Sequence, residues 1–553
     1  MISNTKLAES LKRSPVFYGA LLFSGILTGL TVVFPQIGIF EWVALIPGAL
    51  CFIFAALDEK RSFKKMYGIG FLFYMSYFLV NYSWFFSMYP LDFTEFNRLE
   101  AAGVVLIAWI GLSLLATLVY AFIPVLLRLL AKGRLGKKYP ILLPIALAML
   151  WTVAEWSLTL HWTGVPWGRL NLGQTGMIVF AQTASLFGSY FVTFVIVLVN
   201  ALISYALINV GVRKLCIISS SAIFALELLS GVIVLSVTER SMAEDEKIKF
   251  AAVQGNVSSK EKWDNSYGIT VSIERHEKYT ELAAKYGADY VVWPETAIPC
   301  SLSGTSSVKR RLSEIANKYE TTIFIGAQLE EPNENGEELF YNAVVMIDED
   351  GNFSDTVYKK QHLVPFGEYV PMRDIITKMI PILSRISLLS YDITAGDEST
   401  VFETEDGVVG TLICFDSIYE SAALESVRNG AEILILPTND SWFDDSRAGN
   451  MHLSQAQMRA IENGRYLVRA ANTGISAVVS PTGEIMDSQD LLTEGLVIEE
   501  VAMRDQRTLY SYIGNTFVYL IVTLILMWVA FDIGYSAIQA SKSKRGRNND
   551  TCD

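Results

Sequence analysis

Three short segments carry side chains that together could perform nucleophilic chemistry, and each follows an apolar run. Glu295 comes after VVWP, Cys414 comes after GTLI, and Lys360, His362 and Glu368 lie in YKKQHLVPFGE. A thiol becomes a strong nucleophile when a neighbouring base, such as a carboxylate, takes its proton. A lysine ammonium can stabilise the negative charge that forms on a carbonyl oxygen under attack. These residue types therefore indicate attack by a cysteine on a carbonyl carbon.

The same residues have ordinary structural interpretations, which the residues alone leave open. A single cysteine is commonly a small apolar core residue, a lysine pair is commonly a solvated surface, and a glutamate after proline is commonly a turn residue. We interpret His362 and His452 as structural hydrogen-bonding residues and Cys300 as a residue without a part in the chemistry. The four histidines and five cysteines lack metal-ligand or disulfide spacing, so we expect no metal site and no disulfide framework.

The polar part of the chain, residues 238–512, must position these side chains. Short β-rich runs such as KIKFAAVQGNV, TTIFIGAQL and EILILPTN alternate there with amphipathic stretches at 270–286, 306–319 and 450–463. This alternation predicts an α/β domain in which helices cover a sheet. Cys414 then lies where a strand passes into a helix, close to backbone N–H groups that can stabilise a thiolate or an oxyanion.

The remainder of the chain is apolar enough for a membrane protein. Of the 553 residues, 51% are hydrophobic and 18% are charged, whereas soluble proteins carry about 25% charged residues. A formal net charge of −13 excludes a typical nucleic-acid binder. Eight runs reach the roughly 20 residues that cross the hydrocarbon layer: 16–34, 39–57, 67–88, 102–127, 140–160, 177–209, 215–237 and 514–538.

Lysine and arginine residues predict how these helices are oriented. They concentrate before the first run, at 58–65, at 128–138, at 213–214 and in the C-terminal tail, whereas the loops 89–100 and 161–174 are acidic or aromatic. Cytoplasmic loops are rich in Lys and Arg, so both termini are predicted to be cytoplasmic. The predicted domains are seven membrane helices in 1–237, an extracytoplasmic domain 238–512, a C-terminal helix 513–540 and a basic cytoplasmic tail 541–553, of which 541–549 is expected to be disordered.

The segments WPETAIP, K-x-H-L-V-P-F-G-E and ICFD together resemble the Glu–Lys–Cys pattern of the nitrilase (carbon–nitrogen hydrolase) superfamily. With the membrane helices added, the chain resembles the bacterial apolipoprotein N-acyltransferase family, a membrane-bound branch of that superfamily. The resemblance extends over essentially the whole chain and includes a TG-x-PW core within 155–170, NDSWFDDS at 439–446 and the segment 452–474. It implies a polytopic α-helical membrane domain and an extracytoplasmic α-β-β-α sandwich.

The resemblance also implies roles for individual residues. Cys414 matches the nucleophile, Glu295 the general base and Lys360 the catalytic lysine, with the neighbouring Lys359 as the alternative one residue away. Glu368 matches a second glutamate that assists this triad. The family often has Cys-Tyr-Glu at the nucleophile, whereas this chain has Cys414-Phe415-Asp416, which keeps a carboxylate but loses a phenol. Any part played by a tyrosine hydroxyl in lipid contact or acceptor choice is therefore in doubt.

The implied reaction is ping-pong transfer of a fatty acyl chain from a membrane phospholipid to the α-amino group of a lipoprotein S-diacylglyceryl-cysteine, through a thioester on the cysteine. The implied enzyme works in the bacterial cytoplasmic membrane as a monomer, without a cofactor, a metal or a nucleic-acid partner. Trp167, Trp442 and Phe443 are candidates for lipid contact, although an interfacial aromatic belt explains them equally well. The alternatives are a membrane-tethered amidase or hydrolase, an acyltransferase with another amine acceptor, and an outer binding domain without catalysis.

Overall fold

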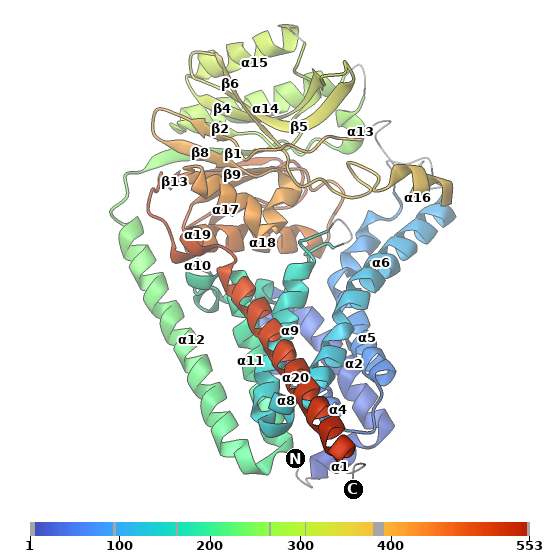
Figure 1. The fold of residues 1–553 in the computed structure, drawn as a ribbon. Coiled ribbons are helices and arrows are strands. Elements are labelled where there is room, and N and C mark those ends of the chain that lie inside the picture. Colours follow the sequence, from blue (N-terminus) through green and yellow to red (C-terminus); the bar gives the residue numbers. More distant parts are fainter. Residues whose placement is uncertain are drawn as a thin grey trace.

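A computed structural model describes residues 6–91, 96–161, 164–264, 267–304, 306–379 and 392–549. The chain forms a helical bundle and an α/β domain, and both chain ends lie at the end of the bundle that is remote from the α/β domain (Figure 1). The main bundle helices are α2 Ser14–Val33, α4 Ile46–Leu57, α5 Phe63–Asn81, α6 Arg98–Tyr120, α7 Phe122–Lys132, α9 Leu143–Ser157, α11 Ser189–Ile208, α12 Arg213–Met242 and α20 Thr516–Asn549. Short helices join them: α1 Lys6–Leu11, α3 Glu41–Ala44, α8 Arg134–Lys138, α10 Ala184–Phe187 and α19 Leu509–Ile513.

Within the described residues, seven helical segments are long and apolar enough to cross a membrane. They are Ser14–Val33, Pro35–Leu57, Arg98–Lys132, Pro140–Ser157, Ser189–Ile208, Val210–Met242 and Thr516–Ser541. Helix α5 occupies the place of the predicted run 67–88 but is not among the seven, because Lys64, Lys65 and Asn81 lower its mean hydropathy. Its side chains pack against α2, α6 and α7 inside the bundle. The number of spans therefore stays a prediction.

The predicted run 177–209 is helical only in its later part. Residues Leu170–Phe180 form a 3₁₀ segment, η4, and α11 begins at Ser189 after Gly188, whose φ of +82° lies in the region that favours glycine. Residues 180–185 are buried where the bundle meets the α/β domain, and Gln182 donates to the Thr482 carbonyl there at 2.8 Å. One contact across this junction is the hydrogen bond from Thr175 Oγ1 to Ser454 Oγ. The expectation of one continuous helix over 177–209 was therefore wrong.

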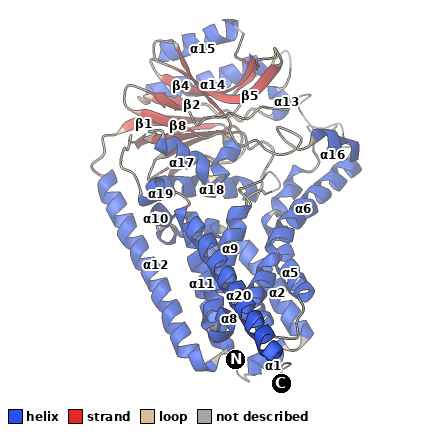
Figure 2. Ribbon diagram, in the orientation of Figure 1, coloured by secondary structure: helices blue, strands red, loops and turns tan. Residues whose placement is uncertain are grey.

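The α/β domain contains two sheets, drawn as two layers of strands in Figure 2. One sheet has the order β13-β1-β2-β4-β5-β6, with β3 beside β4, and the other has the order β12-β11-β10-β9-β8-β7. The strands are β1 Ile248–Gln254, β2 Tyr290–Val292, β3 Ile298–Ser301, β4 Thr322–Pro332, β5 Glu338–Ile347, β6 Phe353–Lys359, β7 Val401–Glu403, β8 Val408–Thr411, β9 Ile433–Thr438, β10 Leu467–Ala471, β11 Ser476–Val479, β12 Ile485–Gln489 and β13 Gly495–Val501.

The two sheets pack face to face, and helices cover their outer faces. Side chains from both sheets, among them Phe250, Val292, Val409 and Ile435, form one shared core between the layers. Helices α14 Gly268–Lys285 and α15 Ser306–Tyr319 cover the first sheet, and α17 Glu420–Arg428 and α18 Arg447–Asn463 cover the second. Two short helices, α13 Ser259–Lys262 and α16 Arg373–Met379, lie in the connections. This arrangement confirms the predicted α-β-β-α sandwich.

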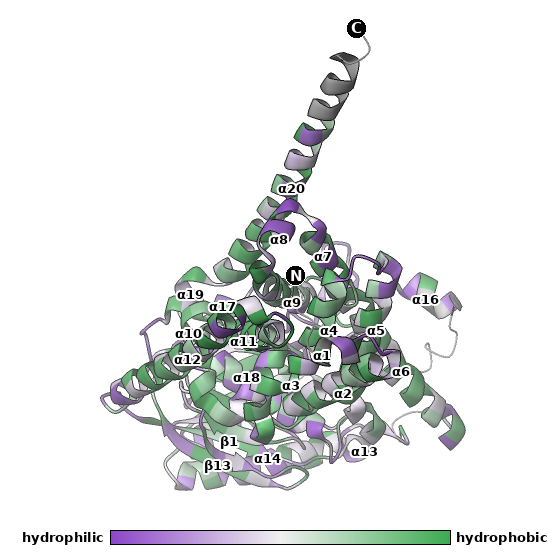
Figure 3. Ribbon diagram, turned by 90° about the horizontal axis from the view of Figure 1, so that it is seen from below, coloured by the Kyte–Doolittle hydropathy of each residue, from purple (hydrophilic) through white to green (hydrophobic). Residues whose placement is uncertain are grey.

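Helix α20 continues to Asn549, so the expected disorder of residues 541–549 was wrong. Lys and Arg are good helix formers, and basic residues stabilise the C-terminal end of a helix, so the preceding apolar helix propagates through this segment. Figure 3 looks at the bundle from the end that holds the termini and shows α20 leaning away from the other helices. Its side chains at Leu526 and Ile533 are largely exposed, as expected for residues that face lipid.

Candidate active site

The predicted chemical residues meet where strands of both sheets end. Glu295 follows β2, Lys360 follows β6, and Cys414 follows β8 after two further buried residues. Asp440 follows β9, and Asn342 lies within β5 beside the strand that leads to Lys360. The sandwich brings these ends together because parallel strands within each sheet present their carboxyl ends at one edge.

A buried ammonium lies between two carboxylates at the centre of this group. Lys360 Nζ donates to Glu295 Oε1 at 2.9 Å and to Glu368 Oε1 at 3.0 Å, and the side chain of Lys360 is 1% exposed. Burial by itself would lower the pKa of Lys360, but the charges of Glu295 and Glu368 outweigh it and hold that pKa well above its ordinary value. The ammonium therefore stays protonated and can act as a fixed positive charge.

The alternative lysine points elsewhere. Lys359 Nζ donates to Glu331 Oε2 at 2.6 Å and lies over the ring of Tyr341, on the opposite side of the strand from Lys360. Successive side chains of a strand alternate between its faces. The structure therefore brings Lys360, and not Lys359, to the two glutamates.

Asn342 is a member of this group that sequence reasoning missed. Its Nδ2 donates to Glu295 Oε1 at 2.6 Å and to Glu368 Oε1 at 2.9 Å. The remaining oxygen of Glu295, Oε2, accepts from the backbone N–H of Asn439 at 2.8 Å. A signal was present in the sequence, because Asn342 is the one polar residue in the run FYNAVVMI. The asparagine fixes both carboxylates by the same amide group.

Cys414 stands on a sharp turn from strand to helix. Its φ is +47°, a strained value for a residue other than glycine, and it begins the 3₁₀ helix η7 Cys414–Ile418. Burial and the charge of Glu295 raise the pKa of the Cys414 thiol, and the charge of Lys360 opposes them. The thiol is therefore protonated at rest and is electrostatically coupled to both residues. It needs a base at the moment of attack.

Asp416 and Phe415, the two residues after the cysteine, face different surroundings. Asp416 is fully buried, and its carboxylate accepts from Tyr358 Oη at 2.9 Å, from the Ile413 N–H at 3.0 Å and from the His362 N–H at 2.8 Å. It ties the loop after β6 to the turn that holds the cysteine. Phe415 instead packs into the apolar core shared with the helical bundle.

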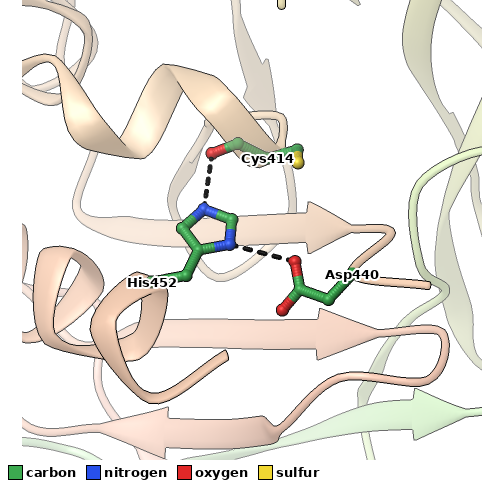
Figure 4. Close-up of side chains that lie close together, drawn as sticks. All are labelled: Cys414, Asp440 and His452. Atoms are coloured by element: carbon green, nitrogen blue, oxygen red, sulfur yellow. Dashed lines mark hydrogen bonds and ion pairs between the residues drawn. The ribbon is translucent and has the colours of Figure 1, made fainter. Parts of the chain in front are cut away.

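A second hydrogen-bonded chain supports the cysteine from α18. His452 Nδ1 lies 3.0 Å from Asp440 Oδ1, and His452 Nε2 lies 3.1 Å from the main-chain oxygen of Cys414 (Figure 4). Burial alone would raise the pKa of Asp440, but the charges of Arg469 and His452 hold it below its ordinary value. The position of His452 agrees with the structural role expected for it, since it holds the backbone of the cysteine.

The same three residues offer the geometry of a candidate metal site. The Cys414 sulfur, an Asp440 oxygen and a His452 nitrogen lie within 4.8 Å of one another. The Arg469 guanidinium, however, pairs with the Asp440 carboxylate, and both imidazole nitrogens already lie within hydrogen-bonding distance of oxygen atoms. Hydrogen bonds and this ion pair account for the cluster without a cation, so we assign it a supporting role.

Aromatic side chains from both domains gather beside His452. The Trp167 ring lies 5.4 Å from that of Trp84, 5.5 Å from that of Phe443 and 5.4 Å from that of His452. Ser87 Oγ donates to the Phe443 carbonyl at 2.9 Å, which ties the loop after α5 to the loop after β9. Trp167 is buried, whereas Trp442 and Phe443 are partly exposed. The cluster forms an apolar wall between the bundle and His452, the residue that contacts the Cys414 carbonyl.

A buried ion pair joins the bundle to the turn after the cysteine. Arg169 Nη1 donates to Glu420 Oε2 at 3.0 Å, and Arg169 Nη2 donates to the Ile418 carbonyl at 2.9 Å. Arg169 Nη2 also donates to Gln455 Oε1 at 3.2 Å, so it reaches α18 as well. The segment that carries Arg169 follows the TG-x-PW core of the sequence. This segment therefore positions the nucleophile turn over the bundle.

Comparisons with known proteins find a family match for each of the two parts of the chain. Residues 249–509 match the family described as carbon-nitrogen hydrolase, and residues 24–202 match the apolipoprotein N-acyltransferase N-terminal domain. A Geobacter metallireducens protein called apolipoprotein N-acyltransferase is 29% identical over 510 residues, covering 90% of this chain and 92% of that protein. A Brucella suis protein of the same name is 30% identical over 434 residues, covering 78% of each.

Among solved structures, Saccharomyces cerevisiae Nit3, a member of branch 10 of the nitrilase superfamily, aligns with 48% of this chain and 93% of its own length. That alignment has 23% sequence identity and a TM-score of 0.36. The family matches and the named relatives confirm the resemblance that the sequence motifs indicated.

Proposed function

The chain belongs to the apolipoprotein N-acyltransferase family, and from this premise we propose that it transfers a fatty acyl chain from a membrane phospholipid to the α-amino group of a lipoprotein S-diacylglyceryl-cysteine. The observation that carries the proposal is a cysteine on a strained turn, beside a lysine held between two carboxylates and directly above an apolar helical bundle. Both substrates keep their acyl chains in the bilayer. Extracting such a chain into water would cost about 0.8 kcal/mol per CH₂, which a membrane-embedded enzyme avoids.

In the first half-reaction, Cys414 is the nucleophile and Glu295 the general base. Glu295 takes the thiol proton while the sulfur attacks the ester carbonyl carbon of the phospholipid. Lys360 and the backbone N–H of Phe415 stabilise the oxyanion. The ester C–O bond then breaks, Glu295 returns its proton to the leaving oxygen, and a lysophospholipid departs from a Cys414 thioester. The raised pKa of the thiol supports this order, because the thiolate forms only when a base accepts its proton.

In the second half-reaction, the lipoprotein amine attacks the thioester carbonyl. Glu295 takes a proton from the attacking nitrogen, the C–S bond breaks, and the released sulfur recovers that proton. The products are an amide and the free thiol. Glu368 and Asn342 keep Lys360 and Glu295 aligned in both steps, because Glu368 accepts from Lys360 and Asn342 donates to Glu295. Because the two substrates use one site in turn, ping-pong kinetics are expected.

We assign the aromatic wall to the path of the acyl chains. Phe443 and Trp442 follow β9 on the bundle side of the site, and Trp167 packs behind Phe443. Large flat side chains form an apolar surface that an acyl chain can cover without stranding polar groups. Trp167 would act through Phe443, because it is itself buried.

The orientation in the membrane is also a proposal. The termini and the α/β domain lie at opposite ends of the bundle, so they occupy opposite sides of any bilayer that the bundle crosses (Figure 1). The basic loops lie at the end that holds the termini, which favours a cytoplasmic location for that end. The α/β domain would then be extracytoplasmic, where exported lipoproteins are available. A reporter fused after residue 240 should lie outside, and one after residue 545 should lie inside.

Mass spectrometry of the purified protein incubated with phospholipid tests the mechanism. The expected result is a hydroxylamine-labile acyl adduct on Cys414 that persists in water and disappears when a diacylglyceryl-cysteinyl peptide is added. Glu295→Gln should abolish the adduct while leaving the far-UV circular dichroism spectrum unchanged. The control is Glu331→Gln, which removes a carboxylate that contacts Lys359 outside this group.

Other results would redirect the proposal. An adduct that water hydrolyses as fast as it forms would favour a membrane-tethered hydrolase. Absence of an adduct, with Cys414 freely reactive towards alkylating agents, would favour an amidase with a substrate that is not a lipid. A Glu295→Gln variant with normal turnover would place the base elsewhere.

A further inference from the structure

A second buried lysine lies behind the proposed general base. Lys262 ends the short helix α13 and is 3% exposed, and its Nζ donates to the main-chain carbonyl of Glu295 at 3.3 Å. Burial of an ammonium costs several kcal/mol unless nearby groups compensate it. An apolar side chain would fill this space at lower cost. The charge therefore needs an explanation beyond packing.

The main chain that Lys262 contacts is held in an unusual conformation. Thr296, which follows the glutamate, has a φ of +49°, a strained value for a threonine. Gly326 of β4 packs closely against the same main chain, where an added Cβ would stand 2.3 Å from the Pro294 carbonyl oxygen and 2.7 Å from the Glu295 Cα. Close packing against β4 and the hydrogen bond from Lys262 therefore both hold this turn, and its shape sets the direction of the Glu295 carboxylate.

Lys262 also changes the charge balance of the site. Without it, the carboxylates of Glu295 and Glu368 face the single ammonium of Lys360. Burial lowers the pKa of Lys262 to about 8, against the opposing influence of Glu295, so the ammonium is mostly protonated at neutral pH. Two positive charges then stand against two negative ones.

The other charged groups around Lys262 leave this balance intact. His276 of α14 faces it, and burial lowers the pKa of His276 to about 4, with the charge of Lys262 acting in the same direction, so that the imidazole is neutral. Glu261 on the same short helix pairs with Arg275 of α14 at 3.0 Å, outside the buried group. The Lys262 ammonium thus contacts the main-chain carbonyl of Glu295, and the Glu295 carboxylate is the negative charge that acts on it.

We propose that Lys262 is a positioning residue for acyl transfer, whose ammonium holds the Glu295 carbonyl and supplies the second positive charge of the site. This inference rests on the proposed function, because it assigns Lys262 a part in the proton transfers that Glu295 performs. Lys262 acts through Glu295 and does not touch the reacting atoms.

The test compares Lys262→Met, Lys262→Arg and the control Glu261→Gln in the purified full-length protein in phospholipid vesicles. The rate of acyl adduct formation on Cys414 should fall at least about tenfold in Lys262→Met at neutral pH, with the apparent KM for phospholipid unchanged. In the wild type the rate should fall as the pH rises through about 8, because Lys262 then loses its charge. Lys262→Arg should keep most of the activity, and its rate of adduct formation should not decrease as the pH rises through 8, because arginine stays charged. Glu261→Gln should behave as the wild type does.

A second readout separates this inference from the proposed function. Alkylation of Cys414 by iodoacetamide requires the same transfer of a proton to Glu295 but no lipid. It should slow in Lys262→Met and recover in Lys262→Arg, whether or not the wild type forms an acyl adduct. Suppose that alkylation slows in Lys262→Met and recovers in Lys262→Arg, but that the wild type forms no acyl adduct. That result would refute the proposed function and leave the inference about Lys262 standing.

Two results would overturn the inference. One is a Lys262→Met variant with wild-type rates in both assays. The other is a Lys262→Arg variant whose rate still falls through pH 8, and this result remains informative if Lys262→Met does not fold.

Discussion

Removing the charge of Arg169 should loosen the junction that carries the nucleophile turn. The guanidinium makes four hydrogen bonds: to Glu420 at 3.0 Å, to Tyr190 at 3.3 Å, to the Ile418 carbonyl at 2.9 Å and to Gln455 at 3.2 Å. The side chains of Arg169 and Glu420 are 1% and 3% exposed. Breaking a buried pair of this kind by removing one partner typically costs about 3–5 kcal/mol, because the other charge is stranded. We expect Arg169→Met to lower the free energy of unfolding by that amount.

A double-mutant cycle separates the pair from general packing. In Arg169→Met with Glu420→Gln no charge is stranded, so we expect the double variant to be more stable than Arg169→Met alone. The assay is denaturant unfolding in mild detergent, followed by tryptophan fluorescence and analysed by linear extrapolation. Adduct formation on Cys414 is measured in parallel. It should fall in Arg169→Met, because Ile418 belongs to the helical turn that begins with the cysteine.

The pH dependence gives a further check with a definite sign. Burial alone would raise the pKa of Glu420, but the charges of Arg169 and Arg459 outweigh it and lower that pKa. A carboxyl with a lowered folded-state pKa stabilises the fold above its unfolded-state value, and this stability is lost as the pH falls through the folded-state pKa. In Arg169→Met the buried Glu420 carboxyl has lost its positive partner and is more easily protonated. The difference in the free energy of unfolding between the wild type and Arg169→Met should therefore become smaller between pH 7 and pH 5. If the two proteins are equally stable at pH 7, or if the difference in their free energies of unfolding grows on acidification, the reasoning is refuted.

Three further predictions concern the catalytic group. Lys360→Met should abolish the acyl adduct whereas Lys359→Met should retain it, and the reverse result in the same mass spectrometric assay would reassign the lysine. Asn342→Leu should lower turnover about 10- to 100-fold, since a hydrogen bond to a charged group is worth about 1.5–3 kcal/mol; turnover within twofold of the wild type would remove it from the group. In a Cys300→Ser, Lys262→Arg background, where the residue at position 262 stays charged, alkylation of Cys414 should be slow at pH 7 and still increase above pH 9, because the pKa of the thiol is raised. A plateau near pH 8.5, the ordinary value for cysteine, would contradict the coupling.

The sequence was most informative where a residue type and its place at a strand end coincided. Glu295, Lys360, Glu368 and Cys414 were all identified from their motifs, and the structure brings them together. Because successive side chains of a strand alternate between its faces, Lys359 and Lys360 point in opposite directions, but the motif alone did not determine which of the two faces Glu295. That choice depends on the register of β5 against β6, which tertiary pairing determines.

Other features could not be deduced, because the same sequence pattern occurs in residues with different structural roles. An apolar run at 177–188 looks the same whether lipid or a covering domain buries it, so the start of the helix at Ser189 was misplaced. Lys262 stands in the polar segment SSKEKW and resembles a surface lysine, because its burial arises only when α13 packs against α14. Asp416 stands where the family often has a glutamate, so a carboxylate could be expected there. Only the structure shows that this carboxylate accepts hydrogen bonds from Tyr358 and from the His362 N–H.

The pairing of the first and last strands of the α/β domain bears on how the chain is synthesised. β1 pairs with β13 in antiparallel register from Ile248 opposite Val501 to Gln254 opposite Gly495. One edge of the first sheet therefore stays open until nearly the whole domain has been synthesised, and such non-local pairing forms slowly. An open edge is a template for pairing with other chains. A chain truncated before residue 495 would keep that edge exposed, whereas a chain that includes β13 closes it before α20 follows.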